Sequence, residues 1–354
     1  MYFEKKTLLN VNKIDINDNY CIIWHNDTIT INDKKNISGN INYFLRFENS
    51  LLVEINDGEL ASIYNLDNNL TYQIDKTGEF LNNRIILLGY WNESYTTRLT
   101  KAISFANKNF ELWISERAFI KTFPLDDDYF FSFNENSIFL NKVIDAEIVW
   151  QHDLKTKYNW KQKADYINEP EIEKQSEVIK FLGVYKNELW LVLNSGGLLA
   201  LNVKTGEKSR YIKDGKIIKG QSDFENFKGA FGYDTILDKE SKLIFNLSKQ
   251  FYIEFNLDSN EEYFNSYNFN ESSSIDHNLY LNYIGGYDVK NIFAYEGSKN
   301  NHFAIFNRQE KKVIWSNEIK EVKNKFPAIR DMKYRLGKIY VVDYNNTLHI
   351  FEKE

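Results

Sequence analysis

Histidine and cysteine, which commonly bind metals or act in catalysis, are few in this 354-residue chain and do not cluster along it. Its histidines form no HxxxH or HxH pair, the spacings that present two imidazoles to one zinc ion. No GxSxG, P-loop or GxGxxG motif is present either. The sequence therefore predicts no catalytic residue, no metal site and no cofactor. The five histidines are His25, His152, His277, His302 and His349.

Two other groups are candidate sites. Asp126, Asp127 and Asp128 offer the hard oxygen ligands that calcium prefers, but three adjacent acids without spaced partners are typical of a solvated loop. Cys21 begins an apolar run, which indicates a buried structural thiol and not a nucleophile. A chain with one cysteine forms no intramolecular disulfide, which fits a reducing compartment.

Charge and hydropathy narrow the classes of partner. A net charge of −6 argues against nucleic acid as the main partner. No run of 18 apolar residues is present, so no membrane partner is expected, and the first fifteen residues lack the apolar core of a signal peptide. We expect a cytoplasmic protein, unless a leader has been removed.

The elements that would position any site are strands. Runs of four to eight β-branched and aromatic residues recur between turn formers, and the best helical candidate is the short charged stretch 169–180. One unit repeats: a polar residue closes a strand, a tight turn follows, and the next strand carries an aromatic residue. The repeat is clearest at 202–211, 256–264 and 307–315, and looser at 65–72, 106–113 and 141–150.

The spacing of the repeat predicts the fold. Its closing aromatics are 37 residues apart at the nearest (113 to 150) and 61 at the farthest (150 to 211), with about four strands in each interval. This is the signature of β-propeller blades. We predict one all-β propeller domain over residues 1–354, with four-stranded antiparallel blades, eight favoured and seven the alternative. Residues 1–9 are expected to pair with the strand at 347–351 and close the ring.

A family resemblance follows from the same repeat. Residues 199–207, Leu-Ala-Leu-Asn-Val-Lys-Thr-Gly-Glu, resemble the A-L-D-x-x-T-G-x-x-x-W repeat of the quinoprotein-dehydrogenase-like (PQQ-repeat) β-propellers, and residues 303–315 resemble it without the Thr-Gly. The resemblance implies that Trp113, Trp150 and Trp315 dock against neighbouring blades, with Tyr72, Tyr211 and Phe264 as substitutes elsewhere. Quinoprotein enzymes of this family use a calcium-held quinone and usually a vicinal disulfide. One cysteine excludes that disulfide, so dehydrogenase activity is not expected.

Two insertions interrupt the repeat, at residues 153–177 and 213–234. Loops longer than about 12 residues in a compact domain are usually functional or disordered. Aromatic residues on such loops are frequent energetic centres of interfaces. We therefore expect a protein partner at the insertions, while Trp160 packing its own loop onto the ring is the structural alternative. The candidate anchors are Tyr158, Trp160, Tyr166, Phe224 and Phe227.

Three functions remain open. The first is a non-enzymatic protein-binding propeller, of which a bacterial cytosolic inhibitor or immunity-type protein that occludes a basic toxin or enzyme is one form. The second is a propeller enzyme acting on a glycan or small molecule, which would need carboxylates converging on a central channel. The third is an envelope assembly scaffold.

Overall fold

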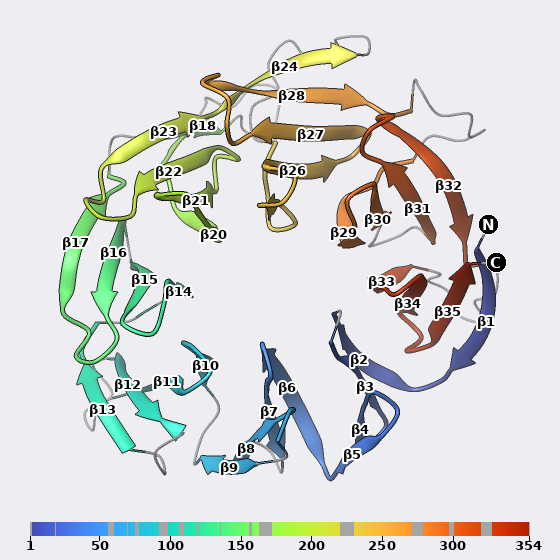
Figure 1. The fold of residues 1–354 in the computed structure, drawn as a ribbon, viewed down its shortest axis with the longest axis horizontal. Helices are drawn as coiled ribbons and strands as arrows, with labels where there is room; N and C mark the ends of the chain where they lie inside the picture. Colours follow the sequence, from blue (N-terminus) through green and yellow to red (C-terminus); the bar gives the residue numbers. More distant parts are fainter. Residues whose placement is uncertain are drawn as a thin grey trace. The chain divides into compact units, whose positions relative to one another are not determined.

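The chain consists of β-strands in a computed structural model, which describes the following residues, to which all structural statements below refer: 2–17, 19–55, 60–68, 70–74, 78–91, 98–105, 110–117, 119, 121–134, 136–155, 158–162, 172–219, 230–270, 279–296, 301–319 and 328–353. Within these residues no helix is long and apolar enough to cross a membrane. The chain divides into two compact units, Gly39–Tyr211 and the pair of segments Met1–Ser38 and Ile212–Glu354. Figure 1 labels most strands of both.

The Gly39–Tyr211 unit holds four antiparallel blades of four strands, each in chain order. A two-stranded hairpin, β18–β19, lies between the third and fourth blades in sequence. The strands are β6 (Ile41–Phe47), β7 (Ser50–Ile55), β8 (Leu60–Asn65), β9 (Thr71–Ile74), β10 (Glu79–Phe80), β11 (Ile85–Trp91), β12 (Arg98–Ser104), β13 (Phe110–Ser115), β14 (Lys121–Pro124), β15 (Tyr129–Asn134), β16 (Ser137–Lys142), β17 (Ile148–Asp153), β18 (Trp160–Gln162), β19 (Ile172–Lys174), β20 (Val178–Tyr185), β21 (Glu188–Leu193), β22 (Leu198–Asn202) and β23 (Lys208–Ile212).

The other unit also holds four blades, and one of them gains a fifth strand because β24 adds to β28 in parallel. Its strands are β1 (Tyr2–Leu8), β2 (Val11–Ile16), β3 (Cys21–His25), β4 (Thr28–Ile31), β5 (Lys35–Ser38), β24 (Asp214–Lys219), β25 (Ile236–Asp238), β26 (Leu243–Ser248), β27 (Phe251–Asn256), β28 (Tyr263–Asn268), β29 (Tyr283–Tyr287), β30 (Asn291–Tyr295), β31 (His302–Asn307), β32 (Lys312–Glu318), β33 (Ile329–Arg335), β34 (Lys338–Asp343) and β35 (Leu348–Lys353).

The N-terminal strand completes the C-terminal blade. β1 pairs antiparallel with β35, with Tyr2 opposite Lys353 and Leu8 opposite Leu348, in the sheet order β1-β35-β34-β33. Both the predicted pairing of the termini and the count of eight blades are confirmed for the described chain. The chain divides into two compact units, so the assignment of residues 1–354 to a single domain stays a prediction.

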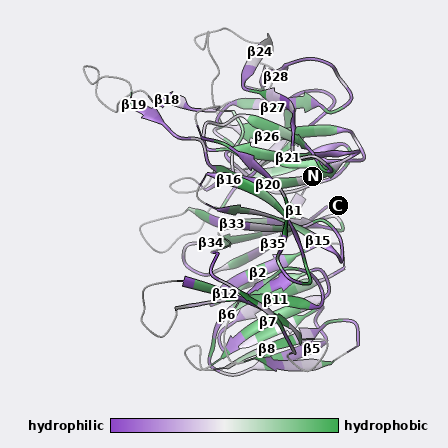
Figure 2. Ribbon diagram, turned by 90° about the vertical axis from the view of Figure 1, so that its left-hand side faces the viewer, coloured by the Kyte–Doolittle hydropathy of each residue, from purple (hydrophilic) through white to green (hydrophobic). Residues whose placement is uncertain are grey.

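Apolar side chains are buried between successive blades within each unit. β21 is buried along nearly its whole length, because a strand inside a blade has a neighbouring blade on each face. One core cluster joins Phe131 and Leu140 of the β14–β17 blade to Phe181 and Leu199 of the β20–β23 blade. Figure 2 shows the resulting contrast in hydropathy between the apolar strands β20 and β21 and the hydrophilic hairpin strand β19.

The asparagine that closes a strand in the repeat is explained by its turn. Asn202 Oδ1 accepts hydrogen bonds from the backbone N–H groups of Lys204 and Thr205, at 2.9 and 3.2 Å. Asn65 and Asn307 make the same pair of bonds to the residues two and three positions later. Asparagine fixes such turns with its own side chain, which is why the residue recurs at this point of the blade.

Two tryptophans dock onto the next blade in the Gly39–Tyr211 unit. The indole N–H of Trp113 donates to the carbonyl of Val143, and that of Trp150 donates to the carbonyl of Val203, both at 2.8 Å. The ring of Trp150 also lies against Gly206, where a Cβ would come within 2.5 Å of it. The docking roles inferred from the resemblance are confirmed for these two residues. Trp315 is only half-buried, packed against Tyr2 and Phe303.

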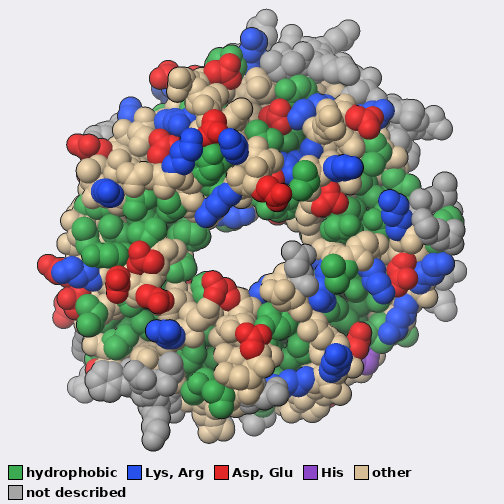
Figure 3. Space-filling model, viewed as in Figure 1, with side chains coloured by type: hydrophobic (Ala, Val, Ile, Leu, Met, Phe, Trp, Pro, Cys, Tyr) green, Lys and Arg blue, Asp and Glu red, His purple; other side chains and the backbone are tan. Residues whose placement is uncertain are grey.

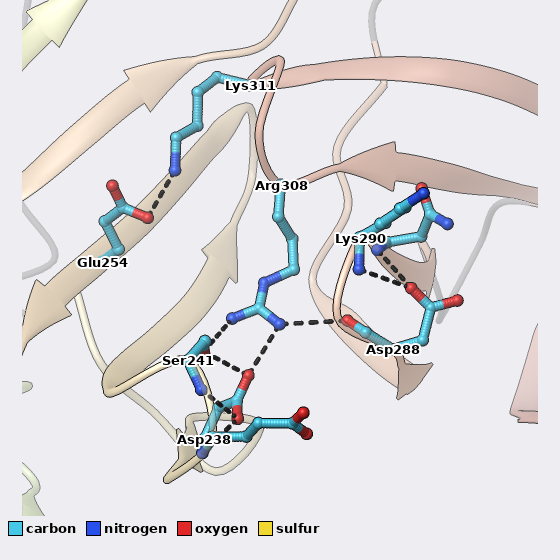
Figure 4. A network of polar contacts seen from close by, with 9 residues as sticks. Asp238, Ser241, Glu254, Asp288, Lys290, Arg308 and Lys311 are labelled. Atoms are coloured by element: carbon cyan, nitrogen blue, oxygen red, sulfur yellow. Dashed lines mark hydrogen bonds and ion pairs between the residues drawn. The ribbon is translucent and has the colours of Figure 1, made fainter.

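A buried ion pair joins two blades of the other unit (Figure 4). Arg308, in the turn after β31, donates to Asp238 Oδ2 at 2.8 Å and to Ser241 Oγ at 2.7 Å, both in the β25–β28 blade. Its guanidinium lies 4.5 Å from the centroid of Phe245. Lys311 of the same turn pairs with Glu254 at 2.5 Å.

Candidate functional site

The insertion at 153–177 contains a two-stranded hairpin, and Tyr158, just before it, lines a cavity. β18 and β19 pair antiparallel, with Trp160 opposite Lys174 and Gln162 opposite Ile172. The charged stretch 169–180, the best helical candidate of a sequence with little helical periodicity, contains β19 and the start of β20. Tyr166 lies outside the described residues.

Tyr158 holds the base of the hairpin to the blade. Its side chain is 4% exposed, lies in the core cluster shared by two blades, and contacts Tyr211 edge-on at 5.0 Å between ring centroids. Burial, followed by the charge of Tyr211, raises the pKa of Tyr158 to about 12, so its hydroxyl remains protonated. Because so little of the ring reaches solvent, its predicted role as a partner anchor is corrected to that of a packing residue.

His152 is held by hydrogen bonds beside this tyrosine. Nδ1 lies 2.8 Å from the carbonyl oxygen of Gly206, and Nε2 lies 3.1 Å from Tyr158 Oη. A carbonyl only accepts, so Nδ1 carries a proton and donates it to Gly206, while Nε2 shares a hydrogen bond with the tyrosine hydroxyl. Both ring nitrogens are therefore engaged, and neither is free to bind a metal. The two side chains line a cavity of about 690 Å³ with Gln151, Tyr211 and the turn at residues 205–208.

Trp160 and Ile172 form a small apolar patch on the hairpin. Residues directly opposite one another share a face of a hairpin, as do residues two apart on one strand. Lys174 lies opposite Trp160 and two residues after Ile172, so Trp160, Ile172 and Lys174 lie on one face. Ile172 is 52% exposed, and Trp160 is half-buried. The indole nitrogen of Trp160 is buried and meets no acceptor within the described residues. Asn159, next to the patch, donates to Glu173 at 3.0 Å.

The insertion at 213–234 extends a blade. β24 lies parallel to β28, and Gly215 is required there because a Cβ would come within 2.2 Å of the Phe264 ring. Phe231 covers the same ring edge-on at 5.2 Å. The predicted anchors Phe224 and Phe227 lie outside the described residues, so their role stays a prediction.

The other polar candidates have structural partners. Asp126 Oδ1 accepts from the backbone N–H groups of Asp128 and Tyr129, which makes the acidic triplet a turn. His302 lies 3.2 Å from Glu296, and burial raises the pKa of the Cys21 thiol. Among the residues placed in the structure, no group of three or more His, Cys, Asp or Glu side chains could hold a metal ion. His277 is outside them.

Sequence reasoning missed Ile172 and His152 as parts of this site. Ile172 lies twelve residues after Trp160 in the sequence, and only the pairing of the hairpin strands brings both to one face. The period-two alternation of the two short strands would have indicated the patch, had the position of the hairpin been known. His152 is placed by the turn of the next blade, which is a non-local contact.

Comparisons with known proteins find similarity in structure and not in sequence. No family model matches the chain, and no curated protein matches it.

Solved structures match over almost the whole chain. The computationally designed Ika8 protein has a TM-score of 0.58 at 8% identity, over 98% of this chain and 96% of its own. BamB from Moraxella catarrhalis has a TM-score of 0.53 at 10% identity, over 100% of each chain. Sqt1 from Saccharomyces cerevisiae has a TM-score of 0.56 at 9% identity, over 100% of this chain and 98% of its own. Together with the eight blades, these matches show that the chain has the fold of an eight-bladed β-propeller.

Proposed function

We propose that this protein is a non-enzymatic, cytoplasmic protein-binding β-propeller whose blades are of the PQQ-repeat type. Within that class we favour a bacterial inhibitor or immunity-type protein that occludes a toxin or enzyme. The observation that carries the proposal is the β18–β19 hairpin, which presents Trp160 and Ile172 on one face. Rigid scaffolds that carry binding residues on inserted loops are a common arrangement in protein recognition.

The composition of the hairpin supports a protein as its ligand. Trp160 supplies a large aromatic ring that is half-buried, so part of its surface is open to a partner. Lys174 is exposed on the same face as the patch, and Lys161 and Glu173 are exposed on the other face of the hairpin. Apolar side chains with charged neighbours are a common combination in protein interfaces.

Charge supports a basic target. The net charge of −6 would steer a positively charged partner toward the protein and raise the association rate. Figure 3 shows acidic and basic side chains together on one face, so this face carries charges of both signs and is not uniformly negative. Recognition would then depend on individual sites as well as on the overall field.

A photo-crosslinking experiment tests the proposal. Benzoylphenylalanine is placed at Trp160 or Ile172, and at Leu336 as a control, since Leu336 is 74% exposed in the other unit. A protein captured in the host from positions 160 and 172 but not from 336, and identified by mass spectrometry, is the expected result. The purified partner should then bind the Trp160→Ala/Ile172→Ala variant at least about 30-fold more weakly than the wild type.

The alternative role of Trp160 has a distinct outcome. If Trp160 only packs its loop, the double variant lowers the melting temperature and leaves the affinity for the captured protein unchanged. Equal capture from position 336 would also contradict the proposed site.

A further inference from the structure

A cleft of about 610 Å³ opens at the first strands of three successive blades in the Gly39–Tyr211 unit. It is bounded by β6, β10 and β14, which Figure 1 shows at the ends of their blades opposite the last strands β9, β13 and β17. The residues that matter for its chemistry are Tyr43, Phe47, Glu48, Glu79, Phe80 and Phe123. The site lies on other elements than the hairpin, and the volume is within the range of small-ligand pockets.

The short strand β10 makes room for the cleft. In the described chain β10 spans two residues, between the seven of β6 and the four of β14. Gly78, directly before it, lies tight against β11, because a Cβ there would come within 2.4 Å of the Leu87 carbonyl oxygen. Gly78 lines the cleft and, having no side chain, takes up little of its space.

Aromatic rings form the walls of the cleft. Phe47 and Phe80 lie in contact, with their centroids 6.0 Å apart, and Phe123 of β14 faces the same space. Tyr43 stands on β6 with its side chain 40% exposed. Ring faces carry partial negative charge and attract cations.

Carboxylates lie at the rim of the same cleft. Glu48 and Glu79 both line it and both are exposed, and Glu54 lies directly opposite Tyr43 in the β6–β7 pair. Burial, and then the charges of Glu79 and Glu54, raise the pKa of Tyr43, which indicates negative potential at this ring. The cation in the lining, Arg46, donates to the backbone carbonyl of Glu48 at 3.2 Å.

We propose that this cleft binds a cationic group, an alkylammonium or a guanidinium, carried on an apolar stem. The stem lies between the rings of Phe47, Phe80 and Phe123, and the charge lies between Tyr43 and the carboxylates of Glu48 and Glu79. Such a group reaches the cleft either as a free polyamine or as a lysine or arginine side chain of another protein. The inference holds for both sources and does not depend on the hairpin site.

Titration calorimetry with matched probes tests the proposal. The probes are a blocked peptide, acetyl-Gly-Arg-Gly-amide, the same peptide with citrulline in place of arginine, and spermidine. Citrulline keeps the shape of arginine and lacks its charge, so we expect at least tenfold weaker binding of the citrulline peptide. Tighter binding of spermidine than of the peptide identifies a free amine as the source, and the reverse identifies a side chain.

Variants locate the binding. Glu79→Gln and Tyr43→Ala change exposed side chains and should each weaken arginine-peptide binding at least fivefold. Glu116→Gln is the control: Glu116 is exposed and follows β13, the last strand of its blade, so binding should stay within twofold. Trp160→Ala should also leave binding unchanged, which separates this site from the hairpin. Equal binding of the arginine and citrulline peptides, or no effect of Glu79→Gln and Tyr43→Ala, would overturn the proposal.

Discussion

Docked tryptophans join two pairs of successive blades in one compact unit, and a buried ion pair joins one pair of blades in the other. In the Gly39–Tyr211 unit, Trp150 reaches forward and donates to Val203 in the turn between the third and fourth strands of the next blade. In the other unit, the turn at the same place in its blade sends Arg308 back to Asp238. The turn between the third and fourth strands therefore accepts a hydrogen bond from the preceding blade in one unit and donates one to the preceding blade in the other.

The two kinds of junction differ in what remains buried when one side chain is removed. A tryptophan contact is mostly apolar, so its loss leaves a cavity and one unpaired carbonyl. Loss of Arg308 leaves a carboxylate buried without its counter-charge, since both side chains of the pair are less than a tenth exposed. Burial alone would raise the pKa of Asp238, but Ser241 and Arg308 outweigh it and hold that pKa below its usual value. Replacement of a single side chain should therefore destabilise the ion-pair junction more than a tryptophan junction.

The largest effect is expected for Arg308→Ala. Breaking a buried pair from one side costs about 3–5 kcal/mol, because the remaining charge stays desolvated. The double variant Arg308→Met/Asp238→Leu removes both charges and should recover much of that loss. Urea unfolding of the three proteins measures this, and a loss below about 1 kcal/mol in Arg308→Ala would show that water replaces the guanidinium.

Trp150→Ala should cost about 3–5 kcal/mol, the range for truncating a core aromatic, because the indole is 8% exposed. Trp315→Ala should cost about half as much, since Trp315 is half-buried and keeps part of its surface in water. Thermal unfolding of the two variants gives the comparison. Equal losses would mean that burial of the ring does not set the strength of these junctions.

Gly206→Ala tests the tryptophan junction from the other side, in the turn that Trp150 contacts. Gly206 has φ +71° and Gly337 has φ +78°, but a Cβ meets the Trp150 ring only at Gly206. We expect about 1–2 kcal/mol of backbone strain at both positions and about 1–3 kcal/mol more at Gly206 from the clash. The difference between the two variants in urea unfolding therefore isolates the contact with Trp150. Identical losses would contradict a tight junction.

The smallest effect concerns pH and the terminal strands. His349 of β35 contacts Glu4 of β1 at 2.7 Å through Nδ1 and Asp343 at 3.3 Å through Nε2. Burial alone would lower the pKa of His349, but Asp343 and Glu4 outweigh it and raise the pKa above 6.5. Burial would likewise raise the pKa of Asp343, but its hydrogen bonds, those with His349 and Thr347 first, hold it below 3.8.

The sign of the pH effect follows from both shifts. The His349 contribution is fully present below about pH 6.5 and is lost as pH rises through the higher folded pKa, while that of Asp343 is lost as pH falls below about 4. The melting temperature of the wild type should therefore exceed that of His349→Gln most between about pH 4 and 6.5. A difference that grows above pH 7 would contradict this assignment.

Periodic and local features of this fold could be predicted from the sequence. The repeat of a strand-closing asparagine, a turn and an aromatic residue gave the blades, because each part lies within ten residues of the next. Trp150 was expected to dock and does so. Pairing of β1 with β35 also followed, since a chain that ends one strand short needs an outer strand from elsewhere.

Side-chain contacts that lie outside the repeat and between residues far apart in sequence could not be predicted. Arg308 and Asp238 are 70 residues apart, and neither stands in a pattern that indicates a buried charge. The cleft depends on the two-residue strand β10, which has no sequence marker. Nor does a loop sequence reveal which aromatic faces inward, so Tyr158 and Trp160 looked equivalent although only Tyr158 is fully buried.

The pairing of β1 with β35 also fixes an order of events during synthesis. Glu4 and His349 are in contact although 345 residues separate them. At about 5–20 residues per second, a ribosome needs roughly 17–70 s to make the chain between them. For that interval β1 is outside the ribosome without its partner, an unpaired strand edge of the kind that invites aggregation. The composition of β1 should limit aggregation during this interval, because five consecutive residues, Phe3 to Thr7, are exposed and three of them are charged.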